Sequence, residues 1–396
     1  MADAPPATWH LIAFLGGITA LAAFSTDISV PALGVIAEDF NRPSGSGGLL
    51  IGVLFVSYGV GQLFWGVFSD AYGRKPALIL SLSGFALASF ACAVAPDFTI
   101  LLVARTAQGL MMGAPVIARA IVRDTMSGRE MARLMALLGA ILTGCVLAAP
   151  LLGSLLLVVA TWHSHFLLLG ALGAGMSLYA AFAFGETVRA RRPERFSFGF
   201  VAQSTRFLMT TRPFMFPALI LCFTFGGYAS LGAVGAVVAE EQFGVGPSQF
   251  GLLFAIAAIA NLTAAFFARR LLGFMAPRKV NRIGVSILGI AGLVHAAISF
   301  ADPGLVAYWA AVCLYVFAFG MVLPVSFALA LEPAGRMPGF AAAVVGMAYT
   351  AAATMVVFMV THFFDGSHRT ISVAMAVMAA SAVAVRLVSW ATEPRG

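Results

Sequence analysis

A succession of long apolar runs constrains the fold of this chain more than any other feature. Twelve runs, each about as long as the roughly 20 residues that a membrane-spanning helix requires, lie at approximately 10–36, 47–68, 77–96, 98–120, 130–160, 164–185, 213–239, 248–268, 280–300, 304–331, 338–363 and 370–392. Lipid offers no hydrogen-bond partners to backbone N–H and C=O groups, so runs of this length form helices. We therefore predict an all-α polytopic membrane protein with twelve transmembrane helices.

The charged residues are few and unevenly placed. Only 10% of the residues are charged and 61% are hydrophobic, whereas about 25% of the residues in soluble domains are charged. Of the 23 Lys and Arg residues, Arg105, Arg119 and Arg386 lie within runs, and Arg42 and Arg369 face outward if the N-terminus is cytoplasmic. The remaining 18 then lie on the cytoplasmic side, as the positive-inside rule requires. The net charge of +7 thus indicates topology, with both termini cytoplasmic, and a nucleic-acid partner is strongly disfavoured.

Residue types that would support enzymatic or metal chemistry are sparse. The four cysteines lie inside apolar runs and are interpreted as small buried hydrophobes, without metal or disulfide spacing. The only lysines are Lys75 and Lys279, neither of them in a phosphate-binding loop, and no zinc-protease motif occurs. We expect no catalytic residue, no metal and no bound cofactor. An intramembrane enzyme is the least favoured class, and a receptor lacks a long loop for a ligand domain.

The chain divides into two sets of six runs. The polar stretch that begins ETVRARRPERFSFGF separates an N-terminal bundle, 1–185, from a C-terminal bundle, 213–396, with a cytoplasmic linker over 186–212. The tripeptide GLL at Gly48 recurs at Gly251, and the dipeptide RK at Arg74 recurs at Arg278, about 200 residues later. Together these features predict two pseudo-symmetric six-helix bundles that rock about a central site.

Three motifs resemble those of the major facilitator superfamily over essentially the whole chain. The segment GVFSDAYGRKP is similar to the loop between the second and third helices of that family, with Ala71 in place of an arginine, and the matching residues are Gly66, Asp70, Gly73, Arg74, Lys75 and Pro76. In the fourth run, LLVARTAQGLMMGAP resembles the arginine-bearing motif of the family through Arg105, Gln108, Gly109 and Gly113. In the fifth run, the residues similar to the motif of proton-exchanging exporters are Gly139, Gly144, Pro150 and Gly153.

Two further segments resemble the Bcr/CflA drug-resistance transporters within this superfamily. They are STDISVPAL, from Ser25 to Leu33, and RAIVRD, from Arg119 to Asp124. Relatives often have Tyr-Leu before the proline where this chain has Ser29 and Val30. The resemblance implies a proton-coupled antiporter of the bacterial inner membrane that works as a monomer in the lipid bilayer. It exports a small molecule and uses the proton as its coupling ion.

Asp27 is the one acidic residue deep in an apolar run, and we predict that it carries the proton. An ionisable group at that depth costs at least about 2.5 to 3.5 kcal/mol, which demands a functional reason. Counted at 1.5 Å per residue, Arg105 lies at a comparable depth, so the two side chains can pair. Burial and a nearby guanidinium act in opposite directions on the proton affinity of a carboxylate. The alternative is a static ion pair that pins two helices.

Asp70, Arg74 and Asp124 form a second candidate set, with Gly66, Gly73 and Lys75, at the cytoplasmic face. The resemblance implies a latch that holds the outward-facing state, with Asp70 near the start of the eleventh helix, close to Pro338 and Gly339. A carboxylate beside a helix N-terminus gains about 0.3 to 1 kcal/mol, a bias suited to a reversible latch. The alternative is a solvated turn that serves topology alone.

The substrate cavity should be lined by aromatic, Met and neutral polar residues. The candidates are Phe24, Tyr58, Gln62, Gln108, Tyr228, Asn261, Tyr315, Phe319, Met347 and Tyr349. Because few charges are available, we expect the substrate to be amphipathic and neutral or cationic. A proton-coupled importer of a small metabolite has the same fold and proton chemistry, and only the fifth-run motif and the Bcr/CflA-like segments favour export.

Overall fold

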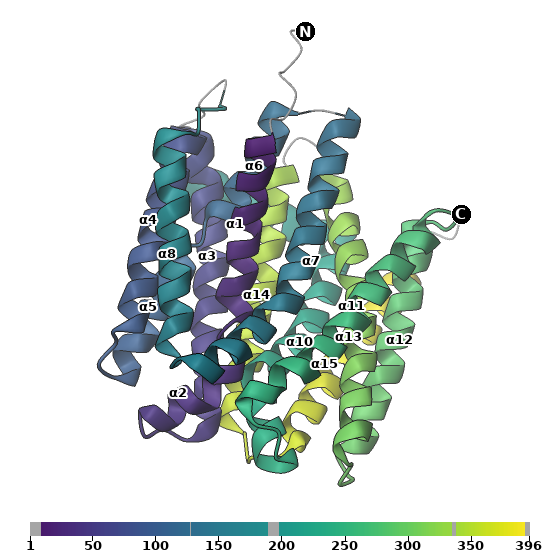
Figure 1. The fold of residues 1–396 in the computed structure, drawn as a ribbon. Coiled ribbons are helices and arrows are strands. Elements are labelled where there is room, and N and C mark those ends of the chain that lie inside the picture. Colours follow the sequence, from purple (N-terminus) through teal and green to yellow (C-terminus); the bar gives the residue numbers. More distant parts are fainter. Residues whose placement is uncertain (1–8, 127, 189–197, 335–337, 393–396) are drawn as a thin grey trace.

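The computed structural model of the protein consists of helices joined by short turns, and it describes residues 9–126, 128–188, 198–334 and 338–392 (Figure 1). Within these ranges the α-helices are α1 Trp9–Asp27, α2 Leu33–Asp39, α3 Gly48–Tyr72, α4 Arg74–Ala93, α5 Phe98–Met111, α6 Ala114–Thr125, α7 Gly128–Val159, α8 His163–Phe182, α9 Phe198–Thr210, α10 Arg212–Phe243, α11 Pro247–Leu272, α12 Pro277–Ile298, α13 Leu305–Leu331, α14 Pro338–His362 and α15 His368–Thr392. Short 3-10 helices cover Val30–Ala32, Ser44–Gly47 and Glu332–Ala334.

The predicted set of membrane spans is confirmed. In the described part of the chain, eleven helical segments are long and apolar enough to cross a membrane. The first combines α1 with α2, and the fourth combines α5 with α6. The twelfth expected span is α7, a helix of 32 residues that contains the apolar stretch Gly144–Val159.

The first span breaks directly after Asp27, and Pro31 explains the break. A proline has no backbone N–H and its ring clashes with the carbonyl four residues earlier, which here belongs to Asp27. The helix therefore ends at Asp27, and the chain continues through a 3-10 turn into α2. The break leaves a carboxylate and several backbone carbonyls at mid-span without regular helical neighbours.

The fourth span has a similar break at Gly113, just ahead of Pro115. The indole Nε1–H of Trp65 on α3 donates to the freed carbonyl of Leu110, at 2.8 Å. A Cβ at Gly113 would collide with the Trp65 ring. The interruption is thus stabilised by an aromatic side chain from the neighbouring helix.

The helices pack in two groups, which Figure 1 shows side by side. Helices α1 to α8 pack chiefly on one another, helices α10 to α15 do likewise, and the main contacts between the groups join α3 to α14 and α7 to α11. The predicted linker, 186–212, contains a helix that the sequence did not suggest, α9. Its Leu208 is buried against Phe214, near the start of α10.

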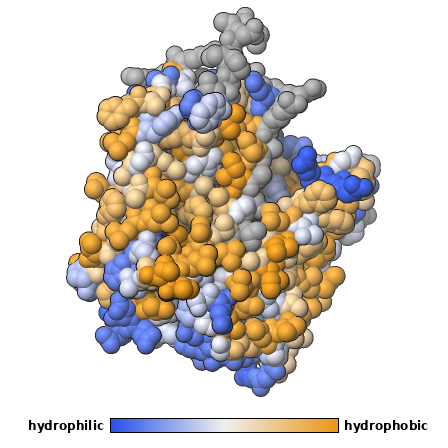
Figure 2. Space-filling model, viewed as in Figure 1, coloured by the Kyte–Doolittle hydropathy of each residue, from blue (hydrophilic) through white to orange (hydrophobic). Residues whose placement is uncertain are grey.

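We name the two ends of the bundle after residues that lie there. The Arg74 end carries Arg74 and α9, and the Asp39 end carries Asp39 and the turn between α14 and α15. The face drawn in Figure 2 is largely hydrophobic, with hydrophilic residues gathered at its lower edge and at its upper right. A broad apolar surface between polar edges is what a bilayer would cover.

The seam between α3 and α14 is built from glycines. A Cβ at Gly52 would lie 2.6 Å from Cε1 of Phe358, and one at Gly346 would lie 2.9 Å from Oε1 of Gln62. A Cβ at Gly59 would collide with the hydroxyl of Thr350. One hydrogen bond crosses the same seam, from Thr354 Oγ1 to the Gly52 carbonyl, at 3.2 Å. The two helices therefore approach more closely than larger residues would allow.

Candidate functional site

A cavity of about 200 Å³ lies between the two halves, midway along the seam. Its lining comes from both halves and consists of Ala22, Ala23, Thr26, Asp27, Phe55, Tyr58, Leu142, Val146, Phe225, Tyr228, Leu231, Phe254, Ala257, Ala258, Asn261, Val316, Phe319, Leu323, Tyr349 and Thr350. Among these described residues, Asp27 alone has a charged side chain. Contacts between the halves lie on both sides of the cavity, at Gly52 toward the Asp39 end and at Gln62 toward the Arg74 end.

Asp27 lies in this cavity because α1 ends there. It is the last residue of the helix, half-buried, and the hydroxyl of Thr26 donates to its Oδ2 at 2.7 Å. The other lining residues offer apolar and aromatic surface together with a few neutral polar groups. The site can therefore hold an apolar or aromatic group beside one carboxylate.

Arg105 is fully buried but does not pair with Asp27. Its Nη1 donates to the Ser25 carbonyl, at 3.2 Å, and to Gln108 Oε1, at 2.6 Å, while its Nη2 donates to Ser29 Oγ, at 3.2 Å. No ion pair of 4.0 Å or less joins Arg105 to Asp27 in this structure, although both residues are described. The direct pair that we considered from the sequence is therefore absent in this conformation.

The guanidinium of Arg105 instead stabilises the break in the first span. Two of its acceptors, the Ser25 carbonyl and the Ser29 hydroxyl, lie on either side of Asp27. The guanidinium carbon also lies 5.3 Å from the centroid of the Phe166 ring, a cation–π distance. Arg105 thus fixes the backbone that presents Asp27 and leaves the carboxylate open to the cavity.

Aromatic rings form much of the cavity wall. Tyr228 and Phe319 stack with centroids 4.5 Å apart and an interplanar angle of 10°, and Phe225 contacts Tyr349 at 4.8 Å. Of the ten predicted cavity residues, those that line it are Tyr58, Tyr228, Asn261, Phe319 and Tyr349. Sequence reasoning missed Phe55, Phe225 and Phe254, because phenylalanine is so common in this chain that no single one stands out.

The other five predicted cavity residues lie outside the lining. Phe24 is half-buried on α1, and Met347 on α14 packs through its backbone near Gly59. The hydroxyl of Tyr315 donates to the Thr224 carbonyl at 3.2 Å. Gln108 holds Arg105 and donates to Ser89 Oγ at 2.7 Å, and Gln62 is buried in the seam, where Arg119 approaches its Oε1 at 3.5 Å.

Residues of the fifth-run motif contact both the break in the first span and the second half. A Cβ at Gly153 would collide with the carbonyl of Ile28, the residue that follows Asp27. The neighbouring Ser154 Oγ donates to the Pro247 carbonyl at 2.9 Å and accepts from the Gly251 N–H at 3.0 Å. Pro150 lies inside α7, the side-chain space at Gly144 is open, and Gly139 lies on the same helix.

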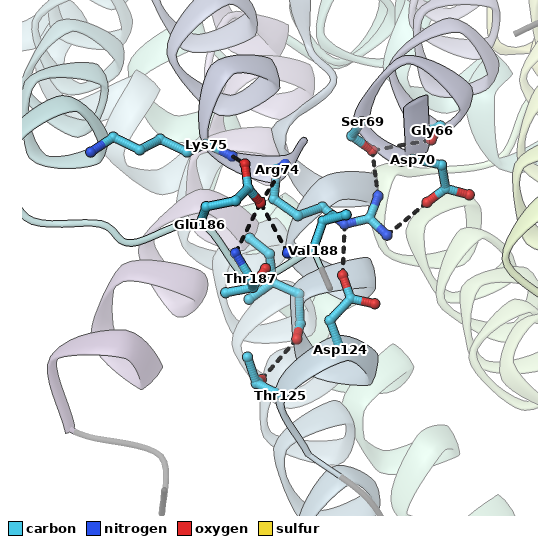
Figure 3. Close-up of polar contacts among 11 residues, drawn as sticks. Gly66, Ser69, Asp70, Arg74, Lys75, Asp124, Thr125, Glu186, Thr187 and Val188 are labelled. Atoms are coloured by element: carbon cyan, nitrogen blue, oxygen red, sulfur yellow. Dashed lines mark hydrogen bonds and ion pairs between the residues drawn. The ribbon is translucent and has the colours of Figure 1, made fainter. Parts of the chain in front are cut away.

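The second candidate set forms a compact charged network at the Arg74 end (Figure 3). Arg74 is buried, and its guanidinium contacts Asp70 Oδ1 at 2.6 Å, Asp124 Oδ2 at 2.8 Å and Ser69 Oγ at 2.7 Å. Ser69 in turn donates to the Gly66 carbonyl at 3.0 Å. The network joins the end of α3, the start of α4 and the end of α6, all within the first half.

From the sequence, Asp70 was expected to lie near the start of α14, close to Pro338 and Gly339. The side-chain surroundings of these two residues lie outside the described part of the structure.

Glu186 extends this network, and sequence reasoning did not find it. Its Oε1 accepts from the N–H groups of Arg74, Thr187 and Val188, at 2.9, 2.9 and 3.0 Å, and its Oε2 accepts from the Lys75 N–H at 3.3 Å. It therefore caps the N-terminus of α4, as Figure 3 shows. Burial raises the pKa of the Glu186 carboxyl, but the four N–H donors outweigh burial and leave the pKa below its ordinary value of 4.5.

Gly73 makes this capping possible. Its φ of 116° lies in the region that favours glycine, and a Cβ there would collide with Glu186 Oε2. Glu186 lies 112 residues after Arg74 in the chain, so no local sequence pattern signals their contact.

In the described part of the chain, no group of three or more His, Cys, Asp and Glu residues is arranged to hold a metal ion.

Comparisons with known proteins agree with the fold and identify the family. The family model of the Major Facilitator Superfamily matches residues 15–357. The chain is 33% identical over 340 residues to the uncharacterized MFS-type transporter YdgK of Bacillus subtilis (strain 168), with 85% of each chain covered. It is 28% identical over 343 residues to multidrug resistance protein D of Escherichia coli (strain K12), with 85% of this chain and 84% of that one covered. Among solved structures, a D-xylose–proton symporter shares the fold, with a TM-score of 0.75 at 18% identity over 97% of each chain.

Proposed function

Since the chain belongs to the major facilitator superfamily, we propose that it is a proton-coupled antiporter that exports small amphipathic, neutral or cationic compounds such as drugs. The observation that carries this proposal is the position of Asp27, which alone among the described lining residues brings a charge into an aromatic cavity between the two halves. The similarity to multidrug resistance protein D supports drugs as the substrate class. The fifth-run motif at the break in the first span supports exchange with protons.

In the proposed mechanism, a proton on Asp27 and a substrate in the cavity compete. The ionised carboxylate favours a cationic or amphipathic molecule against the aromatic walls, and protonation removes that attraction. Each occupant then biases the opposite-facing conformation as the halves rock. The cavity of about 200 Å³ is smaller than the roughly 300–1,000 Å³ of a typical ligand pocket, so a drug-sized substrate requires the halves to separate.

We place the protein in the bacterial inner membrane as a monomer, with both termini and the Arg74 end in the cytoplasm. The distribution of Lys and Arg supports this orientation, because in the described part of the chain only Arg42 and Arg369 lie at the Asp39 end. The Arg74 network then acts as the cytoplasmic latch. Ionic bonds that hold α3, α4 and α6 together keep Asp70 in place to contact α14 when the cytoplasmic ends close.

The experiment is proton release from everted membrane vesicles. Respiration acidifies the vesicle interior, and an antiporter exchanges these protons for substrate added outside, which a pH-sensitive dye reports. We expect toxic compounds against which expression confers resistance to release protons from vesicles with the wild-type protein. Vesicles with Asp27→Asn should lose this release, while the matched control Asp302→Asn, which changes an exposed carboxylate at the Asp39 end, should retain it.

The same assay separates the alternatives. A proton-coupled importer would not release protons when substrate is added to everted vesicles, because its substrate and proton move in the same direction. Substrate-dependent release that is equal in wild type and Asp27→Asn would remove Asp27 from the mechanism. Drug resistance without any proton movement would show a different coupling ion.

A further inference from the structure

The second half carries a counterpart of the Arg74 network that lacks its ionic partners. The RK dipeptide at Arg278 lies at the start of α12 as the RK at Arg74 lies at the start of α4, and Glu332 directly follows α13 while Asp124 lies in the last turn of α6. Arg74 is buried and contacts two carboxylates. The side chain of Arg278, by contrast, is exposed and makes no hydrogen bond or ion pair with any described residue.

A cavity of about 280 Å³ lies beside Arg278. Arginines from three different helices line it: Arg212 from the start of α10, Arg278 from α12 and Arg386 from α15. The side chain of Arg212, like that of Arg278, is exposed and has no polar partner within the described ranges. Among the described lining residues, Glu332 is the one acid, so the cavity carries an excess of positive charge.

A second cavity, of about 290 Å³, adjoins the first and is mainly apolar. Arg386 lines both cavities, and the second continues along α12 and α15 over Val285, Val383, Leu387 and Trp390. Trp390 is 60% exposed and Leu387 is 59% exposed, on a part of the surface that a bilayer would cover. Arg386 lies six residues before the end of α15, or about 9 Å along the helix axis, a depth suited to lipid phosphates and glycerol backbones.

Topology alone does not account for this arrangement. The positive-inside rule explains exposed basic residues at cytoplasmic helix ends, such as Arg269 and Arg270 at the end of α11. It does not require arginines of three helices to converge on one cavity that opens into an apolar groove. A ligand that fits both cavities has an anionic head and an apolar tail.

We propose that the two cavities bind an anionic phospholipid of the cytoplasmic leaflet. Its phosphate lies among Arg212, Arg278 and Arg386, and an acyl chain follows Val383 and Leu387. The lipid supplies the negative charge that Asp70 and Asp124 supply to Arg74, and it joins α10, α12 and α15 as those residues join the helices of the first half. Basic pockets between helices at the cytoplasmic side of a membrane are suited to such headgroups.

The test is lipid binding to the full-length protein in detergent, measured by native mass spectrometry. Phosphatidylglycerol and phosphatidylethanolamine with identical acyl chains are the probes, so that only the headgroup differs. We expect wild type to retain phosphatidylglycerol preferentially. Arg278→Gln/Arg386→Gln should bind it roughly tenfold more weakly or worse, with phosphatidylethanolamine binding unchanged. The matched control Arg269→Gln/Arg270→Gln removes two charges from the same end but none from the cavities, and it should behave as wild type.

Two further measurements keep the result interpretable. Arg278→Gln alone changes an exposed side chain, so a several-fold loss in this folded variant would support the site even if the double variant is unstable. Millimolar inorganic phosphate should not displace the lipid. The proposal is wrong if phosphate displaces phosphatidylglycerol as effectively as excess lipid does. It is also wrong if the control variant loses as much phosphatidylglycerol binding as Arg278→Gln/Arg386→Gln.

Discussion

Removal of the Glu186 carboxylate is the perturbation whose size follows most directly from the structure. Glu186 accepts from four backbone N–H groups, two of them in the first turn of α4. Loss of a helix cap costs about 0.5 to 2 kcal/mol, and the charge itself contributes about 0.3 to 1 kcal/mol near a helix N-terminus. Because Glu186 is exposed, the lower half of each range applies. We expect about 1 kcal/mol of destabilisation for Glu186→Ala and about half of that for Glu186→Gln, which keeps one acceptor oxygen.

The assay is thermal unfolding of the purified protein in detergent, followed by tryptophan fluorescence at pH 7. A loss of 1 kcal/mol lowers the midpoint by about 2 to 4 °C in a domain of 150 to 250 residues. The midpoint of Glu186→Ala should fall by no more than this, and the midpoint of Glu186→Gln should fall by less. The midpoint of the matched control Glu38→Gln should not change. Glu38 is an exposed carboxylate that forms no hydrogen bond or ion pair with a described residue, and its charged neighbour is another carboxylate, Glu240.

The pH dependence gives an independent check. The pKa of Glu186 is lower in the folded protein than its ordinary value of 4.5, so its contribution to stability is complete above that value and is lost as the pH falls through the folded pKa. The difference in midpoint between wild type and Glu186→Gln should therefore be constant from pH 8 to 6 and shrink progressively as the pH falls below 4.5. A Glu186→Ala protein as stable as wild type at pH 7, or a Glu186→Gln deficit unchanged at low pH, would refute the capping role.

Two further substitutions test the latch and the break in the first span. Asp70→Asn removes one carboxylate from Arg74 and should raise the labelling of cysteines introduced at the Arg74 end of the cavity. The control Asp302→Asn should not raise it. Identical labelling in the two variants would contradict the latch. Arg105→Lys keeps the charge but loses the forked guanidinium that donates to Ser25, Ser29 and Gln108. The thermal midpoint should therefore fall by the equivalent of about 1 to 3 kcal/mol. An unchanged midpoint would show that Arg105 does not stabilise the break.

The membrane spans were predictable because each depends only on local composition. The runs that we expected correspond to the helices of the structure, and Asp27 was recognisable because a carboxylate is rare within such a run. The charged turn at Arg74 was predictable for the same reason, since its residues are neighbours in the chain. Even the break after Asp27 had a local signal, Pro31, although its consequence for Asp27 became clear only from the structure.

The remaining features depend on contacts between distant segments. Glu186 accepts a hydrogen bond from the Arg74 N–H although 112 residues separate them in the chain. Arg105 donates to the Ser25 carbonyl and the Ser29 hydroxyl, which flank Asp27, and does not pair with the Asp27 carboxylate. Which aromatic residues face the cavity depends on the rotation of each helix about its axis, which a uniformly apolar sequence does not encode. That is why Tyr228 and Phe319 lie in the lining, whereas Tyr315 turns toward a backbone carbonyl.

The glycine seam between α3 and α14 has a consequence for how this protein can evolve. At Gly52 and Gly59 the two halves meet through hydrogen atoms, so one added methyl group acts as a wedge. Substitutions at these positions would change the lifetime of each conformation of the transporter and leave the residues that line the cavity around Asp27 unchanged. In the proposed mechanism, the rate of transport and the substrate preference can therefore be adjusted separately, the first by substitutions along this seam and the second by exchanging aromatic residues around Asp27.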